Sequence, residues 1–289
     1  MKKIISTLLV AVICIGTAFA QAQPKTSLLW EITGNNLQQP SYLFGTIHII
    51  CEEDFFFPDI VKEKFSNAQE VFLELDMDDP MMMMKMMTML QLPKGPTIKQ
   101  LFADSAAFAA FDKKYQEITG TSAMMFNTFK PFMLMSMLAQ KSLNCANSES
   151  YEQTFMALAA TLKKDIKGLE TMEDQIAVFD GIPDSTEITN LKTMLKDFDK
   201  QVEEFKKLVS VYKTQDVDAM YRFTNQSPEL MGAEEELLTK RNTKWIPVMK
   251  ASMEKGNTFF AVGAAHLGGD IGVIALLRKQ GYTVKPVKL

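Results

Sequence analysis

The sequence has few of the residues that most often carry enzyme chemistry. Its 289 residues include two histidines, three cysteines and two tryptophans, and 31 basic residues do not outnumber 35 acidic ones. The formal net charge of −4 excludes the basic surface that a nucleic-acid-binding protein needs. Beyond the amino-terminal segment, no apolar run approaches the roughly 20 residues needed to cross a bilayer. We therefore expect no nucleic-acid partner and no transmembrane segment in the mature chain.

The amino-terminal segment has the pattern of a secretory signal peptide. Two lysines precede an apolar run over residues 4–15, and small residues suited to cleavage follow at Ala20 and Ala22. We therefore assign residues 1–22 to a signal peptide and residues 23–289 to one α/β domain. The expected location is the periplasm or the exterior. The pattern does not indicate an oligomeric state.

Two cysteines, Cys51 and Cys145, lie beyond this segment. In an oxidising compartment, an isolated pair of cysteines is most simply a disulfide. The alternative is that Cys51, three residues after His48, helps to bind a metal ion. No second thiol with the spacing of a metal site accompanies it. The sequence therefore favours a Cys51–Cys145 disulfide.

Apolar runs separated by helical patterns indicate the fold class. Such alternation predicts an α/β protein with a central, mostly parallel sheet flanked by helices. Large helical insertions are expected over 80–164 and 186–255, the latter interrupted at SPELMG and near Pro247. The expected strands are Leu28–Ile32, Tyr42–Ile47, Glu70–Asp76, 164–170, and the runs NTFFAVGAAH and YTVKPV near the end.

Both histidines occur in the same local frame, which is an apolar strand, a glycine, two residues and then histidine. The two frames are SYLFGTIHII, with Gly45 and His48, and FFAVGAAHLG, with Gly263 and His266. Ligands of parallel sheets bind beyond the carboxyl ends of the strands, so we expect both histidines at one sheet edge. Glycine allows a sharp turn or close approach to a ligand, which makes both glycines candidate substrate-binding positions.

Two glutamates, Glu74 and Glu170, also follow apolar runs. A carboxylate in that position is costly unless a charged partner or a metal ion accompanies it. Two imidazoles and a carboxylate, with one position open for water, form the kind of metal site that hydrolases use. Hydrogen-bonded structural histidines and helix-capping or lysine-paired glutamates remain open alternatives.

Five segments resemble the TraB/PrgY/GumN family, which includes the Tiki proteins. They are YLFGTIH, EVFLELD, KGLET, KRNTKW and FFAVGAAHLGGDIGVIALLRKQGYTV, in this order, and the resemblance covers almost all of the mature chain. It implies the α/β fold shared with erythromycin esterases and ChaN-like haem-binding proteins. It also implies metal-dependent proteolysis of the Tiki type, with both Gly-x-x-His elements and Glu74 in the site.

Arg241, in KRNTKW, matches a recurrent position of the family. Its ordinary interpretation is an exposed arginine on a charged helix. The resemblance instead favours a guanidinium that orients a site carboxylate or stabilises a developing oxyanion.

The combined hypothesis is an exported hydrolase acting on a peptide or a small acyl substrate. A divalent ion (Mn, Co or Zn) would be held by His48, His266 and Glu74, with Glu74 or Glu170 as general base and Arg241 steadying negative charge. A metal-free variant would use Glu74 as base, assisted by the histidines. The alternative from another class is a non-catalytic protein that binds haem or an apolar ligand. Haem would require an axial ligand facing a roomy apolar cavity.

The segment DMDDPMMMMKMMTML holds eight of the 21 methionines. Methionine here can serve as helix core, as an adaptable apolar groove for a ligand, or as a soft Cu(I) site. Consecutive methionines point around the whole helix and do not converge on one side. We therefore favour the core over the groove, and the groove over copper.

Overall fold

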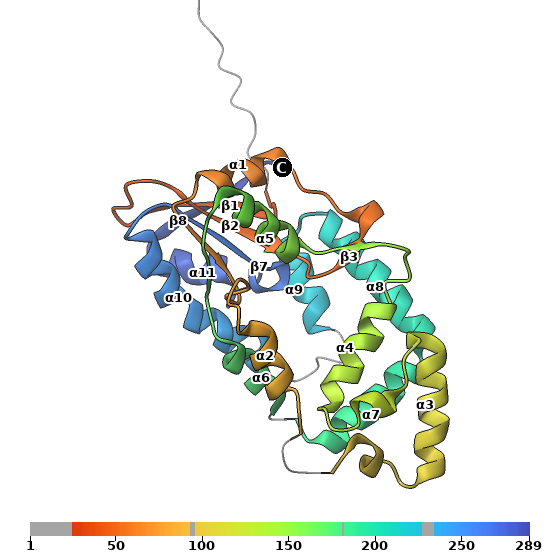
Figure 1. Cartoon of the computed structure of the whole chain (residues 1–289). Coiled ribbons are helices and arrows are strands. Elements are labelled where there is room, and N and C mark those ends of the chain that lie inside the picture. Colours follow the sequence, from red (N-terminus) through yellow and green to blue (C-terminus); the bar gives the residue numbers. More distant parts are fainter. Residues whose placement is uncertain (1–24, 93–95, 181, 227–233) are drawn as a thin grey trace, which may run out of the picture.

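A six-stranded sheet with the order β6-β4-β7-β2-β1-β8 organises the chain in the computed structural model (Figure 1). The structure describes residues 25–289 except 93–95, 181 and 227–233, so the predicted signal peptide and the SPELMG interruption lie outside the described residues. The strands of this sheet are β1 (Leu29–Gly34), β2 (Ser41–Thr46), β4 (Glu70–Leu73), β6 (Ile166–Gly168), β7 (Thr258–Gly263) and β8 (Tyr282–Val287).

The four strands from β6 to β2 run parallel, and β1 pairs antiparallel with both β2 and β8. The two central strands, β2 and β7, are buried along nearly their whole length. A parallel sheet covered on both faces requires such continuous apolar strands. The predicted, mostly parallel α/β sheet is therefore confirmed.

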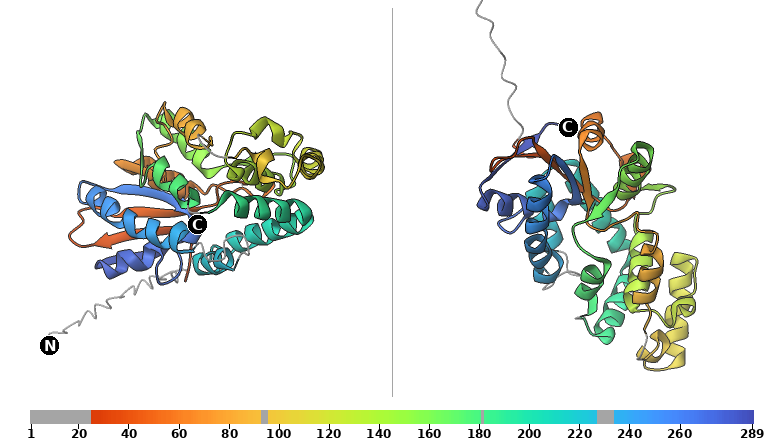
Figure 2. Two further views of the ribbon diagram at one scale, coloured as in Figure 1. Left: turned by 90° about the horizontal axis from the view of Figure 1, so that it is seen from below. Right: turned by 60° about the vertical axis from the view of Figure 1, so that its left-hand side comes forward.

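Helices cover both faces of the sheet (Figure 2). On one face, Phe65 of α1 and Phe155 of α5 pack on Phe259 of β7. On the other face lie α10 and α11, with Trp245 of α10 fully buried. No helix within the described ranges is long and apolar enough to cross a membrane. The helices are α1 (Asp59–Asn67), α2 (Met82–Met89), α3 (Ser105–Thr119), α4 (Pro131–Lys141), α5 (Tyr151–Leu162), α6 (Met172–Asp180), α7 (Asp184–Lys196), α8 (Phe198–Lys213), α9 (Val217–Asn225), α10 (Lys240–Met253) and α11 (Val273–Lys279).

The helical insertion has an apolar core of its own, away from the sheet. Helices α3, α4 and α7 bury Tyr115, Leu134 and Leu191 against one another. These helices lie to one side of the sheet (Figure 1). The insertion therefore does not depend on the sheet to bury its apolar residues.

Two sequence predictions about helices are wrong. Helix α10 continues through Pro247, where an interruption was expected. An interior proline costs about 3 kcal/mol, and the complete burial of Trp245 and Met249, each contributing roughly 1.5–3 kcal/mol, offsets that cost. The Met-rich helix α2 buries none of its residues, so its interpretation as helix core is also wrong.

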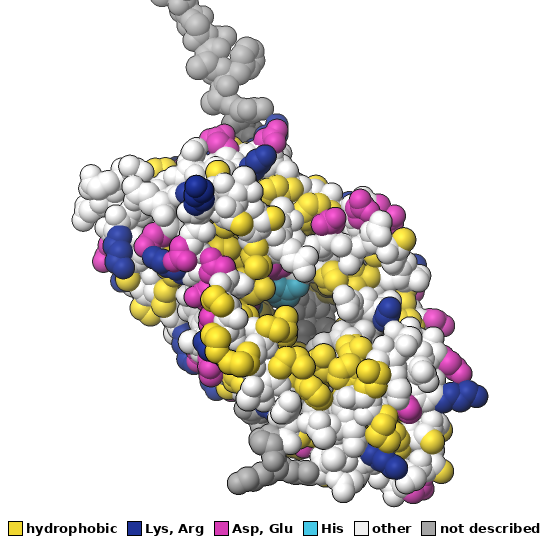
Figure 3. Space-filling view, in the orientation of Figure 1, with side chains coloured by type: hydrophobic (Ala, Val, Ile, Leu, Met, Phe, Trp, Pro, Cys, Tyr) yellow, Lys and Arg dark blue, Asp and Glu magenta, His cyan; other side chains and the backbone are white. Residues whose placement is uncertain are grey.

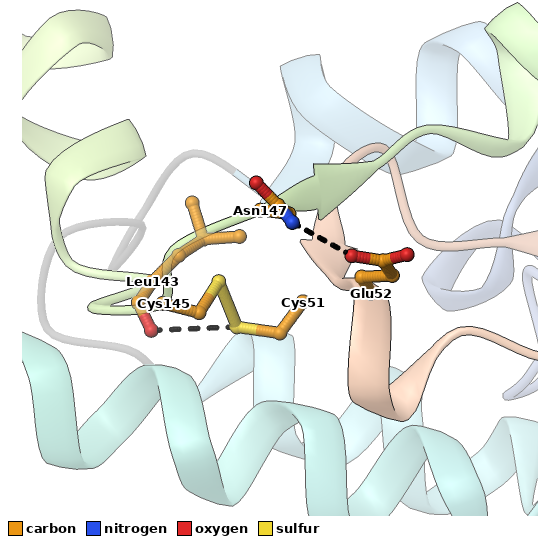
Figure 4. Close-up of a disulfide and its surroundings, with 5 residues drawn as sticks. All are labelled: Cys51, Glu52, Leu143, Cys145 and Asn147. Atoms are coloured by element: carbon orange, nitrogen blue, oxygen red, sulfur yellow. Dashed lines mark hydrogen bonds between the residues drawn. A yellow bond between two sulfur atoms is a disulfide. The ribbon is translucent and has the colours of Figure 1, made fainter.

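A disulfide joins Cys51 to Cys145, and this confirms the predicted pairing (Figure 4). The two cysteines have a Cα–Cα distance of 5.9 Å, beside the short ladder of β3 (Ile50–Cys51) and β5 (Ser148–Glu149). Next to it, the Asn147 side chain donates a hydrogen bond to Glu52. Because its sulfur is bonded, Cys51 does not have the free thiolate that the alternative metal-ligand hypothesis requires.

Removal of the disulfide is expected to lower stability substantially. The bond joins two residues that are 94 positions apart in the sequence, and loss of such a constraint costs roughly 2–5 kcal/mol of unfolding free energy. Urea denaturation of the C51S/C145S variant beside the oxidised wild-type chain measures the difference. Equal midpoints and slopes for the two proteins would contradict a stabilising role.

Candidate functional site

The carboxyl ends of four parallel strands deliver four polar side chains to one sheet edge. His48 follows β2, Glu74 follows β4, Glu170 follows β6 and His266 follows β7. In the space-filling view, a histidine borders a hollow, and hydrophobic side chains form part of its rim (Figure 3). A pocket of about 280 Å³ also extends from Glu170 to Met82 of α2. The Met-rich helix therefore adjoins this edge.

Three of these side chains converge on Gly263, the last residue of β7. The Gly263 N–H donates a hydrogen bond of 2.7 Å to Glu74 Oε1. A Cβ atom on Gly263 would lie 3.4 Å from Glu74 Oε1, 3.5 Å from His266 Cδ2 and 3.9 Å from His48 Nε2. A single small space is therefore bordered by a carboxylate and two imidazoles.

Gly45, in the other Gly-x-x-His element, has a different environment. It is buried within β2, and a Cβ there would lie 3.1 Å from Ala264. Its carbonyl accepts a hydrogen bond from the Tyr212 hydroxyl. Gly45 thus lets β2 approach the turn after β7, and its predicted contact with substrate stays a prediction.

Arg241, at the start of α10, connects the two glutamates. Its Nη2 donates to Glu74 Oε2 and to Glu170 Oε1, both at 2.7 Å. Its Nε donates to both oxygens of Glu170, at 3.0 and 3.1 Å. Burial lowers the pKa of Arg241, but the two carboxylates outweigh this effect and the pKa is raised. The guanidinium is therefore a fixed positive charge between two carboxylates and not an exposed helix arginine.

Hydrogen bonds within the fold occupy the carboxylate of Glu170. Its side chain is 1% exposed, and its Oε2 also accepts a hydrogen bond of 3.0 Å from Trp245 Nε1. Both of its oxygens thus have buried donors.

Glu74 is the more available carboxylate, because its Oε1 borders the space at Gly263. Burial alone would raise the pKa of Glu74, but the neighbouring imidazoles, Arg241 and the Gly263 N–H together lower it to about 2. Its other oxygen also accepts from Gln175 Nε2 at 3.1 Å. Glu74 therefore remains ionised at neutral pH.

The tautomer of His266 follows from its partner Asn242. The Asn242 amide nitrogen donates to the carbonyls of His266 and Ile271, so its Oδ1 faces His266 Nδ1 at 2.6 Å and accepts the proton there. His266 Nε2 is left as an acceptor, and Arg241 Nη1 donates to it at 3.2 Å. Burial lowers the pKa of His266 to about 3, which keeps the ring neutral.

His48 differs from His266 in exposure and in charge. Its side chain is 68% exposed, and its Nδ1 lies 3.1 Å from Glu152 Oε1. Any desolvation of this largely exposed ring would lower the pKa of His48, but the hydrogen bond to Glu152 and the charge of Glu74 outweigh it, and the pKa is raised above its ordinary value. A carboxylate accepts only, so Nδ1 carries a proton and Nε2 faces the space at Gly263.

The imidazoles and the carboxylate at Gly263 are of the types that bind a divalent metal ion, but their spacing in this structure does not form a metal site. Each imidazole gives its Nδ1 proton to an oxygen acceptor, the arrangement that orients histidine ligands of metals. Within the described part of the chain, however, no three His, Cys, Asp or Glu side chains are grouped closely enough to hold an ion. A metal on His266 Nε2 would also replace the hydrogen bond from Arg241.

Several partners of the site were not predicted from the sequence, namely Glu152, Asn242, Gln175 and Trp245. Asn242 and Trp245 belong to the segment KRNTKW, in which the family resemblance indicates a role for Arg241 alone. Glu152 lies in the first turn of α5 after the N-cap Ser150, where a glutamate ordinarily indicates a helix start. No signal in the sequence distinguishes Gln175 from other helix residues.

The fold and this edge define a class: an α/β protein in which imidazoles, carboxylates and an arginine meet beyond parallel strands. The TraB/PrgY/gumN family model matches residues 28–286, so the chain belongs to the TraB/PrgY/gumN family.

Curated relatives share low identity over nearly the whole chain. A protein named metalloprotease TIKI2 from Danio rerio is 24% identical over 90% of this chain and 60% of its own length. Metalloprotease TIKI1 from Homo sapiens is 25% identical over 93% of this chain and 64% of its own. An uncharacterised Treponema pallidum protein is 22% identical over 89% and 81%, respectively. The chain thus spans less than two thirds of the two named metalloproteases. No solved structure is significantly similar to it.

Proposed function

We propose that this chain is an exported hydrolase that cleaves peptide bonds with the help of a divalent metal ion. The convergence of Glu74, His266 and His48 on Gly263 is the observation that carries the proposal. The names of the Danio rerio and Homo sapiens relatives favour proteolysis over other acyl-bond hydrolysis. The disulfide and the signal-like segment 1–22 support export to the periplasm or beyond.

His48 Nε2, His266 Nε2 and Glu74 would hold the ion, which could be Mn, Co or Zn. When bound, such an ion polarises the scissile carbonyl and acidifies a water molecule. The neutral His266 ring already has its lone pair on Nε2. His48 would have to release its Nε2 proton to bind, while Glu152 keeps the proton on Nδ1.

Glu74 is better placed than Glu170 to act on substrate or water. Its Oε1 borders the space at Gly263, whereas both Glu170 oxygens are held by Arg241 and Trp245. Arg241 fixes Glu74 and supplies positive charge beside the negative charge that develops during acyl transfer. Glu170 anchors Arg241 in that position.

Cleavage of a peptide library tests the proposal. The purified mature chain is incubated with the library and Mn²⁺, Co²⁺ or Zn²⁺, and mass spectrometry detects new peptide ends. We expect cleavage that a chelator abolishes and that Glu74→Gln reduces by at least about 10²-fold. The control variant Glu203→Gln, on the exposed face of α8, should cleave as wild type does. Chelator-resistant cleavage would contradict metal dependence, and a Soret absorption band would favour the haem-binding alternative.

Gly263→Ala separates site function from folding. Gly263 has φ −51° and ψ 133°, which alanine adopts without strain, and its Cβ would meet neighbours only at 3.4 Å or beyond. We expect the unfolding free energy to change by less than about 1 kcal/mol. The added methyl group fills the space between Glu74 and the histidines, so cleavage should be lost. Wild-type activity in the Gly263→Ala variant would show that substrate does not enter this space.

A further inference from the structure

The segment that carries His48 is held against the start of α5 by several independent contacts. The β3–β5 ladder pairs Ile50 with Glu149 and Cys51 with Ser148. The Glu52 N–H donates to the Asn147 carbonyl, and the disulfide lies at the same ladder (Figure 4). Two stretches of chain that are distant in sequence are thus fixed side by side. The second of these stretches continues into the first turn of α5, where Glu152 lies.

Glu152 is not used as a helix cap. The N-cap function belongs to Ser150, whose Oγ accepts from the Gln153 N–H. Glu152 instead accepts from three side chains: Oε1 from His48 Nδ1 at 3.1 Å and from the Thr46 hydroxyl at 2.9 Å, and Oε2 from the Ser150 hydroxyl at 3.0 Å. Both oxygens therefore have fixed donors.

An exposed ion pair usually contributes little to folding, and His48 is largely exposed. Two hydroxyl donors nevertheless fix the carboxylate that holds this ring. A fixed acceptor on Nδ1 determines both the tautomer and the orientation of an imidazole. In this case it turns Nε2 toward the space at Gly263.

We infer that Glu152 is the positioning residue of His48, holding the ring by Nδ1 so that Nε2 faces Glu74 and Gly263. Asn242 holds the ring of His266 by Nδ1 in the same way. The difference is that the partner of His48 carries a negative charge and the partner of His266 does not. What His48 then does to a substrate rests on the proposed function, whereas the positioning itself does not.

The test measures the hydrogen bond directly and needs no substrate. The oxidised mature chain is labelled with [15N]histidine, so that only two imidazoles give signals, and His48→Asn assigns them. NMR then follows the exchange of each Nδ1–H with water. We expect two protected Nδ1–H signals in the wild type. In Glu152→Gln, exchange at His48 should become at least about tenfold faster, while His266 stays unchanged. Glu149→Gln, the same charge change three residues earlier, should alter neither signal.

Unchanged exchange at His48 in Glu152→Gln would overturn the inference, as would a wild-type His48 without a protected Nδ1–H. If Glu152→Gln also disturbs the His266 reference signal, the Thr46→Val variant is measured in place of Glu152→Gln. That change removes one hydroxyl donor of Glu152 at nearly constant shape, and faster exchange at His48 alone is again expected. Because cleavage is not measured, failure of this inference is distinguishable from failure of the proposed hydrolase function.

Discussion

Replacement of Arg241 by methionine is expected to lower the free energy of unfolding by about 3–5 kcal/mol, the usual cost of breaking a buried ion pair. The guanidinium pairs with Glu74 and Glu170, whose side chains are 9% and 1% exposed. Methionine supplies similar length and no donor, so two carboxylates lose their main partner inside the fold. Urea denaturation followed by circular dichroism measures the change.

The adjacent Lys240→Met variant is the matched control. Lys240 pairs with Glu236 on the surface, and both side chains are about half exposed. Removal of such a pair costs about 0–1 kcal/mol. Equal losses in the two variants would show that the buried contacts of Arg241 do not stabilise the fold.

Replacement of His48 by alanine should have the opposite effect: the stability of the fold should hardly change, whereas the cleavage rate should fall strongly. The ring is largely exposed, and an exposed ion pair such as the one it forms with Glu152 contributes about 0–1 kcal/mol, so the unfolding free energy should change by less than about 1 kcal/mol. Cleavage of a peptide found in the library assay should fall by at least about 10²-fold. Steady-state rates at saturating metal give the measurement.

Glu53→Ala serves as its control, since this exposed residue lies in the same segment. It should retain wild-type rates. If His48→Ala cleaves as fast as Glu53→Ala, His48 has no part in the reaction, and Glu74 and His266 remain as the candidate metal ligands.

The sheet and the positions of the two histidines were accessible from the sequence for one physical reason. A buried parallel strand must be almost wholly apolar, so β2 and β7 are recognisable, and the first polar residues after them lie at one edge. The same reasoning located Glu74 and Glu170. Strand length was less accessible, since β4 ends at Leu73, before the predicted Asp76.

The residues that hold these side chains in place could not be predicted from the sequence in the same way. A charged helix pattern does not show that Arg241 points to Glu74 and Glu170, because this depends on how α10 packs through Trp245 and Ile246. A glutamate after a helix cap has an ordinary local explanation, so the sequence did not indicate that Glu152 contacts His48. Methionine content alone also does not show whether α2 is covered, because burial depends on neighbours that lie far away in sequence.

Anomalous diffraction from crystals of the active protein grown with Co²⁺ tests the central claim most directly. The proposed function predicts one cobalt peak in front of Gly263, within coordination distance of His48 Nε2, His266 Nε2 and Glu74, with the Arg241 hydrogen bond to His266 broken. A cobalt ion bound only elsewhere, in protein that still cleaves peptides, would contradict a metal-dependent site at this edge of the sheet.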